Sequence, residues 1–161
     1  AMQYSSSNPD QVDKLMVADI APKVYTPNHD QILKGLMDLN TFPPESRINA
    51  DQRLSNFVND QTTRSFLLKN LYRKSDGYAL RINVEVLKEK LAEVMKAPFG
   101  NYYGPTLFLS GENSKYILQE DHIKIKNYFP NSKIKVITKA GHWLHTENPI
   151  AFEAAVMNFL K

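Results

Sequence analysis

A histidine, an aspartate and a serine of this chain each follow a segment with the composition of a buried β-strand. His142 lies in AGHWLHTENP, just after the β-branched segment 133–138, while Asp19 ends one apolar run and Ser114 follows another. An imidazole can act as a general base, and a carboxylate can hold it in the required orientation. This set, with the acid before the histidine and the histidine near the carboxyl end, suits nucleophilic catalysis assisted by a general base.

The residue pattern around these three side chains predicts the scaffold that would bring them together. Helical patterns at 83–95, 118–129 and 149–161 alternate with strand-like segments at 105–111 and 133–138. Strands that alternate with helices imply a parallel sheet. Because the loops that leave the carboxyl ends of parallel strands share one edge, and ligands bind there, the acid, the hydroxyl and the imidazole are expected to converge.

Each residue also has an explanation that involves no chemistry. An aspartate after a strand often caps a turn or helix, and a serine in SGENSKY often stabilises a turn. His142 is the strongest candidate, since small neighbours let the loop bring its ring close to another group. His145 follows three positions later, but no carboxylates converge on it in the sequence, so no metal site is expected. His29 and His122 lie in polar segments and are expected at the surface.

Residues 23–82 differ in character from the rest of the chain. Three segments in it carry apolar residues at three- and four-residue spacing, which predicts amphipathic helices: 28–40, 49–59 and 63–72. The pair Asp76-Gly77 then predicts the turn of a small hairpin. The sequence therefore predicts a compact helical insertion at 23–82, with 1–22 and 83–161 forming the sheet-containing domain.

The bulk composition excludes several classes of function. The chain has 161 residues, of which 42% are hydrophobic, and a formal net charge of +3. These are the values of an ordinary globular protein, and its scattered lysines offer no focused basic stripe for nucleic acid. Because the sequence has no cysteine, disulfides, thiolate metal sites and a cysteine nucleophile are excluded.

The apolar segments are short. None approaches the roughly 20 residues that a membrane-spanning helix needs. The amino-terminal stretch AMQYSSSNPD has no basic region followed by an apolar core, so it does not resemble a signal peptide. We expect a cytoplasmic protein with neither a membrane nor a nucleic acid as partner.

Three stretches together resemble a known family. VDKLMVADIAP at 12–22, TLFLSGENSKYI at 106–117 and GHWLHTENP at 141–149 are similar to the second half of an α/β-hydrolase, and more narrowly to the small bacterial esterases of the YbfF type. The resemblance covers essentially the whole chain. It implies an α/β fold, the C-terminal part of an α/β-hydrolase, in which a parallel sheet is flanked by helices and 23–82 forms an inserted helical cap.

The resemblance also implies roles for the three residues. In most α/β-hydrolases the acid follows the strand that matches TLFLSG, where this chain has Ser114. In the YbfF-type branch the acid comes one strand earlier, at the position that matches Asp19. Asp19 is therefore expected to orient His142, and Ser114 to be an auxiliary hydrogen-bonding partner of the same histidine. Glu112 is a weaker rival for the acid.

The nucleophile of this family lies in the pattern G-x-S-x-G, on a sharp turn from strand to helix. No pair of the six glycines in this chain brackets a serine in that way. Aligned by resemblance, the chain begins just after that turn. We expect the nucleophile and the oxyanion hole to lie in an N-terminal segment of the same protein, or a partner chain to complete the sheet, and the chain alone to be inactive.

The leading interpretation is a serine hydrolase, a carboxylesterase or thioesterase, that acts on small acyl esters or thioesters without a cofactor. One alternative keeps the fold but changes the chemistry, as in dehalogenases, epoxide hydrolases and lyases. Another is a non-catalytic binding module of the same fold. The pairing of Asp19 with Ser114 favours the esterase.

Overall fold

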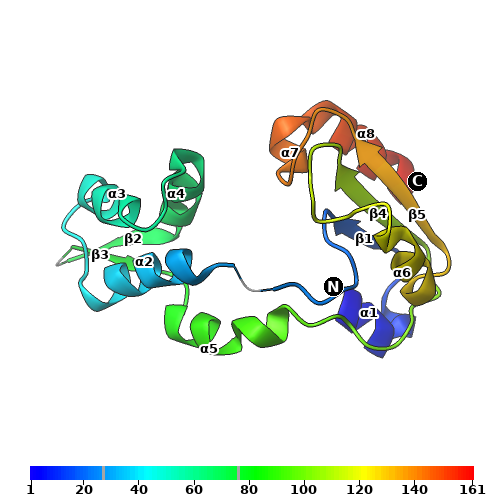
Figure 1. The fold of residues 1–161 in the computed structure, drawn as a ribbon, viewed down its shortest axis with the longest axis horizontal. Helices are drawn as coiled ribbons and strands as arrows, with labels where there is room; N and C mark the ends of the chain where they lie inside the picture. Colours follow the sequence, from blue (N-terminus) through cyan, green and yellow to red (C-terminus); the bar gives the residue numbers. More distant parts are fainter. Residues whose placement is uncertain (27, 76) are drawn as a thin grey trace. The chain divides into compact units, whose positions relative to one another are not determined.

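The structure is a computed structural model that describes residues 1–26, 28–75 and 77–161. The chain divides into two compact units, and the first combines Ala1–Val24 with Ala97–Lys161 (Figure 1). The elements of this first unit, in chain order, are α1 (Met2–Ser7), the 3₁₀ helix η1 (Pro9–Gln11), β1 (Leu15–Ala18), β4 (Thr106–Gly111), α6 (Asp121–Tyr128), β5 (Ser132–Ile137), α7 (Leu144–Glu147) and α8 (Pro149–Leu160).

A parallel sheet forms the centre of the first unit, and among the described residues its strand order is β1-β4-β5. All of β4 is buried, because apolar side chains cover both of its faces. Phe108 packs with Ile125 of α6 on one face, while Leu109 packs with Ala155 of α8 on the other. This alternation follows from the two-residue period of a strand. The predicted α/β class, a parallel sheet flanked by helices, is confirmed.

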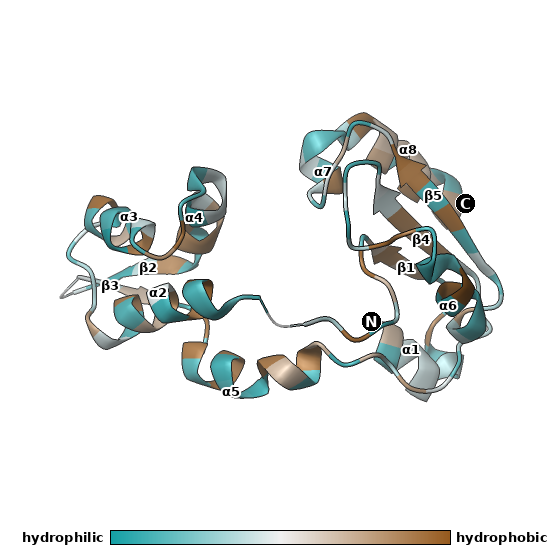
Figure 2. Ribbon diagram, viewed as in Figure 1, coloured by the Kyte–Doolittle hydropathy of each residue, from teal (hydrophilic) through white to brown (hydrophobic). Residues whose placement is uncertain are grey.

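The two outer strands of this sheet differ in polarity. β1 is apolar throughout, and Figure 2 shows it in brown. β5 instead alternates apolar residues with the exposed side chains of Lys133 and Lys135. Charged residues on an outer strand discourage further strand pairing, so β5 is the better protected edge of the two.

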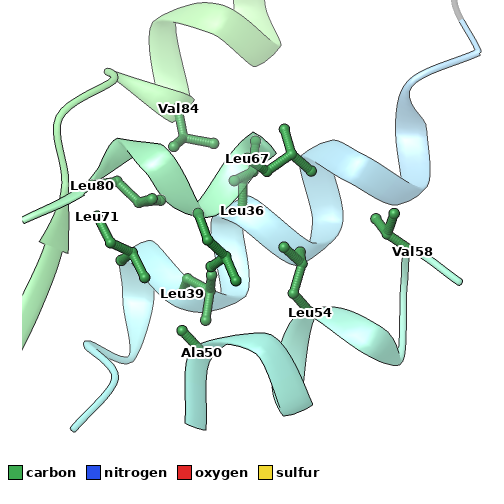
Figure 3. Close-up of a cluster of buried hydrophobic side chains, with 10 residues drawn as sticks. Leu36, Leu39, Ala50, Leu54, Val58, Leu67, Leu71, Leu80 and Val84 are labelled. Atoms are coloured by element: carbon green, nitrogen blue, oxygen red, sulfur yellow. The ribbon is translucent and has the colours of Figure 1, made fainter. Parts of the chain in front are cut away.

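The second unit spans Tyr25–Lys96. Its elements are α2 (Asp30–Thr41), α3 (Arg47–Ser55), α4 (Gln61–Leu67), the 3₁₀ helix η2 (Leu68–Asn70), β2 (Leu71–Lys74), β3 (Gly77–Leu80) and α5 (Val84–Val94). Side chains from these elements form one core, with Leu36, Leu39 and Leu54 close to its centre (Figure 3). None of the helices in the described ranges is both long and apolar enough to cross a lipid bilayer.

Polar residues set the starts of three of these helices. The side chains of Ser46, Asp60 and Asn83 accept hydrogen bonds from backbone N–H groups three residues later, which are unpaired at a helix N-terminus. The expected helix over 63–72 ends earlier than predicted, at Leu67, and the chain continues into β2. The antiparallel hairpin of β2 and β3 is present, while its predicted turn residue Asp76 lies outside the described residues.

The boundary of the second unit differs from the expected one. The sequence placed its end at residue 82 and assigned the following helix to the sheet domain. The compact unit instead extends to Lys96, because Val84 at the start of α5 is buried in the same core as Leu36 and Leu80. Helical periodicity predicts that α5 forms but not which core it joins.

Leu54 tests the core of the second unit, since its side chain is fully buried against Gly35. Leu54→Ala is expected to lower the free energy of unfolding by about 2–5 kcal/mol, because it removes buried methyl groups and leaves a cavity. Urea unfolding measures the change. The control Ile48→Ala, at a side chain that is 72% exposed, should stay within about 0.5 kcal/mol of the unmodified chain. Equal losses in both variants would contradict this core.

Candidate active site

Asp19 lies directly after β1, at the carboxyl edge of the sheet. Its N–H donates to the carbonyl of Leu109, 2.7 Å away, so the ladder with β4 extends as far as this residue. The φ angle of Asp19 is 49°, in the left-handed region, which aspartate tolerates better than most residues. This turn leaves the side chain fully buried.

The described residues give the Asp19 carboxylate three donors. The Gly111 N–H donates to Oδ1 at 3.0 Å, and the Ser114 hydroxyl donates to Oδ2 at 2.5 Å. His142 Nδ1 lies 2.8 Å from the same Oδ2. An ionised carboxylate can only accept, so opposite such a group Nδ1 donates, and in the neutral imidazole the lone pair is then on Nε2. This is the tautomer that a general base requires.

The imidazole is both anchored and accessible. The His142 side chain is 48% exposed, although the Asp19 carboxylate that holds it is buried. Nε2 has no hydrogen-bond partner among the described residues. The arrangement therefore leaves one ring nitrogen of a half-exposed imidazole without a hydrogen bond to the described residues.

The structure brings the three predicted residues together, with one difference in their connections. Ser114 was expected to hydrogen-bond to the histidine, but its hydroxyl donates to Asp19 instead. The turn that closes with the Ser114 N–H on the Gly111 carbonyl places the hydroxyl beside the carboxylate. Ser114 thus acts on His142 through Asp19.

The rival acid, Glu112, serves the backbone. Its Oε2 accepts a hydrogen bond from the Lys139 N–H at 2.7 Å, and Lys139 has a φ angle of 55°. Glu112 therefore stabilises the strained start of the loop that leads to His142. Among the described residues it makes no contact with the imidazole.

Gly111 lets the loops approach closely. A Cβ atom added to Gly111 would lie 2.1 Å from the Gly141 carbonyl oxygen, well inside any tolerated contact. The absence of a side chain therefore allows the loop before His142 to cross the end of β4. The Asn113 N–H, which donates to the Ala140 carbonyl at 2.9 Å, holds the two loops together.

Glu147 holds the backbone on both sides of His142. Its Oε2 accepts from the Gly141 N–H at 2.8 Å, and its Oε1 accepts from the Trp143 N–H at 3.0 Å. The short helix α7 lies shortly after His142 in this loop and places Glu147 opposite these N–H groups. Asn148 then caps α8 and also donates to the Thr138 carbonyl.

The ring of Tyr116 stacks on the imidazole of His142. The ring centroids are 4.0 Å apart and the planes differ by 20°. Sequence reasoning missed both Tyr116 and Glu147. Their signals were the aromatic residue two positions after Ser114 and the acid in HTENP, and neither reveals its partner without the fold.

The described residues do not include a set of three or more histidine, aspartate or glutamate side chains that could hold a metal ion. His145 instead lies near the rings of Trp143 and Phe152. The structure therefore gives His145 an aromatic environment rather than a ligand set.

An ion pair fixes the segment that follows Asp19. Lys23 Nζ lies 2.5 Å from Asp121 Oδ2, and the same oxygen accepts from the Leu118 N–H at 2.9 Å. Burial opposes ionisation of the Asp121 carboxyl, but the hydrogen bonds from Lys23 and Leu118 outweigh it and hold its pKa below the ordinary value. The pair joins the loop after β1 to the start of α6.

Comparisons with known proteins find relatives along the whole chain. The sn-1-specific diacylglycerol lipase ABHD11 of Mus musculus is 36% identical over 99% of this chain and 55% of its own length. The esterase YbfF of Escherichia coli is 32% identical over 94% of this chain and 59% of its own length. A solved structure of a marine microorganism esterase is 37% identical, with a TM-score of 0.91, over 99% of this chain and 65% of that one.

The chain spans about half the length of the curated relatives that it matches. No protein-family model matches it.

Gly111→Ala is expected to lower the free energy of unfolding by on the order of 1–3 kcal/mol, because the new methyl group must displace the Gly141 carbonyl. Thermal unfolding measures the loss, and the amide resonance of Gly141 should move with it. Ala154→Ser enlarges an exposed residue of α8 and is the control. An unchanged Gly141 resonance in Gly111→Ala would show that the loops do not cross in this way.

Asp121 should make stability depend on pH. Because its folded pKa is depressed, its contribution is fully present above the ordinary value of 3.8 and is lost as the pH falls through the folded value. Asp121→Asn should therefore cost most near neutral pH and progressively less in acid. Urea unfolding from about pH 6 to pH 3 measures this difference. Asp10→Asn, at an exposed carboxyl, is the control substitution. A stability difference for Asp121→Asn that stays constant over this pH range would refute the role of the ion pair.

Proposed function

This chain belongs to the α/β-hydrolase superfamily, and from that premise we propose that it supplies the general base and the orienting acid of an esterase-type serine hydrolase. The observation that carries the proposal is the 2.8 Å contact between His142 Nδ1 and Asp19 Oδ2. It fixes the tautomer in which Nε2 can accept a proton. The relatives named as esterases and as a lipase support the same reaction class.

In the proposed reaction, Nε2 of His142 takes the proton of a serine hydroxyl as that oxygen attacks the ester carbonyl. The imidazolium then gives this proton to the departing alcohol, and an acyl-serine remains. A water molecule, deprotonated by the same nitrogen, releases the acid and restores the serine. Asp19 stabilises the imidazolium in both steps and stays ionised.

Ser114 has a smaller role in this scheme. Its hydroxyl shares Oδ2 of Asp19 with the imidazole, so it helps to fix the carboxylate and to satisfy it in a buried position. Since Ser114 does not contact the reacting nitrogen in the described structure, its removal should weaken the positioning of Asp19 rather than abolish base catalysis.

We place the nucleophile and the oxyanion hole on an N-terminal segment of the same protein, which would pair with β1. The polarity of the sheet edges supports this choice. The segment Leu15–Ala18 carries no charged residue, whereas β5 at the other edge carries Lys133 and Lys135. An uncharged parallel strand is normally covered by a neighbour. A partner chain that completes the sheet is the alternative.

The substrate class that we propose is a small acyl ester or thioester, with no cofactor. The second compact unit, Tyr25–Lys96, would be the cap domain of the complete protein. Apolar cap residues are the usual source of selectivity for chain length, since each methylene that fits contributes binding energy.

The test supplies the N-terminal segment, in cis or in trans, and follows hydrolysis of a short-chain nitrophenyl ester. The chain alone is expected to give no turnover. In the completed protein, His142→Ala and Asp19→Asn should lower kcat by about 10²–10⁴-fold, because base catalysis or the correct tautomer is lost. Ser114→Ala should cost about tenfold or less, since it removes one hydrogen bond to a charged group.

His122→Ala is the matched control, because His122 lies on α6 and contributes no side chain to the site. It should retain full activity. Absence of hydrolysis in a protein whose sheet is demonstrably complete would reject the esterase and favour a binding module. An unchanged rate in Asp19→Asn would reject the choice of acid.

A further inference from the structure

We propose that Tyr116 is a positioning residue, whose ring holds the His142 imidazole in the plane that proton transfer requires. The inference rests on the proposed function for its catalytic consequence, although the contact itself does not. Stacking at 4.0 Å with planes 20° apart covers one face of an imidazole that is otherwise half exposed.

A single hydrogen bond cannot fix this ring. The terminal torsion of a histidine side chain has broad energy wells, so the ring plane can swing while Nδ1 stays near its acceptor. The 2.8 Å contact to Asp19 therefore locates one atom of His142 but leaves the direction of Nε2 loosely set. A parallel aromatic neighbour removes that freedom, because rotation about the torsion would drive the imidazole edge into the Tyr116 ring.

Tyr116 is placed by the same network that it supports. Its backbone N–H donates to the Ser114 hydroxyl oxygen at 3.2 Å, and that hydroxyl donates to Asp19 Oδ2 at 2.5 Å. The Tyr116 ring then returns to His142, which is bound to the same carboxylate oxygen. These contacts form a closed cycle that links Asp19, Ser114, Tyr116 and His142. Ser114 therefore positions both the acid and the stacking ring.

The stack also favours the charged form of the imidazole. The face of a tyrosine ring is electron-rich and attracts a cation placed over it. In the proposed reaction, the imidazole of His142 becomes an imidazolium when it accepts the serine proton. An interaction that strengthens at that stage raises kcat and leaves substrate binding unchanged. Removal of the Tyr116 ring is therefore expected to lower kcat and to leave KM unchanged.

The first measurement needs no enzyme activity. NMR relaxation of the carbon-bound protons of the His142 ring reports its order parameter in this chain. Tyr116→Leu keeps apolar bulk without an aromatic face. It should reduce the ratio of stacked to unstacked conformations of the His142 ring by about two- to tenfold. The order parameter of the ring should therefore fall. Tyr116→Phe keeps the stack and should match the unmodified chain. Tyr103→Leu, at a distant exposed tyrosine, is the control.

Amide resonances of the sheet check that each variant is folded. If Tyr116→Leu leaves the ring as ordered as in the control, the proposal is overturned. If Tyr116→Phe loses order as Tyr116→Leu does, the hydroxyl rather than the stack acts, and the proposal is also overturned.

The second measurement uses the completed protein and the nitrophenyl ester. Tyr116→Leu should lower kcat by about two- to tenfold at unchanged KM, with full rescue in Tyr116→Phe. A change confined to KM would overturn the positioning role. If the NMR result holds but no variant hydrolyses ester, the proposed function fails while the positioning of His142 stands, so the two failures are distinguishable.

Discussion

The Asp19 carboxylate is buried, and it accepts donors from both of the other strand-end loops of the sheet. Gly111 donates from the last position of β4, Ser114 from the loop after β4, and His142 approaches from the loop after β5. A buried carboxylate without such partners would be costly, since burial removes its hydration. Each donor therefore stabilises the carboxylate and is itself held by it. The three loops depend on one another through this group.

Close packing of the backbone allows the three loops to converge on Asp19. Gly111 has no side chain where the loop before His142 crosses β4, and any Cβ there would collide with the Gly141 carbonyl. Glu147 fixes the crossing loop by accepting the N–H groups on both sides of His142. Glu112 does the same for the left-handed Lys139. Both glutamates therefore stabilise the backbone of the loop that carries His142.

The site divides into a rigid interior and an accessible nitrogen. Asp19 is buried, whereas almost half of the His142 side chain is exposed. This contrast suits a proton carrier, because the charge-stabilising group is shielded from water while the reacting atom can reach a substrate. Stacking by Tyr116 adds orientation without closing access to Nε2. The outer strand that leads to Asp19, β1, is the apolar one.

Local sequence determined the elements and the edge of the sheet at which chemistry could occur. Strand and helix periods depend on neighbouring residues and are visible without a fold. The convergence of Asp19, Ser114 and His142 followed from parallel topology. Only the tertiary structure decided that Ser114 bonds to Asp19, that Glu147 holds the His142 loop, that Tyr116 stacks on the imidazole and that α5 joins the second core. These contacts depend on side-chain directions and packing between segments far apart in the chain, which periodicity does not encode.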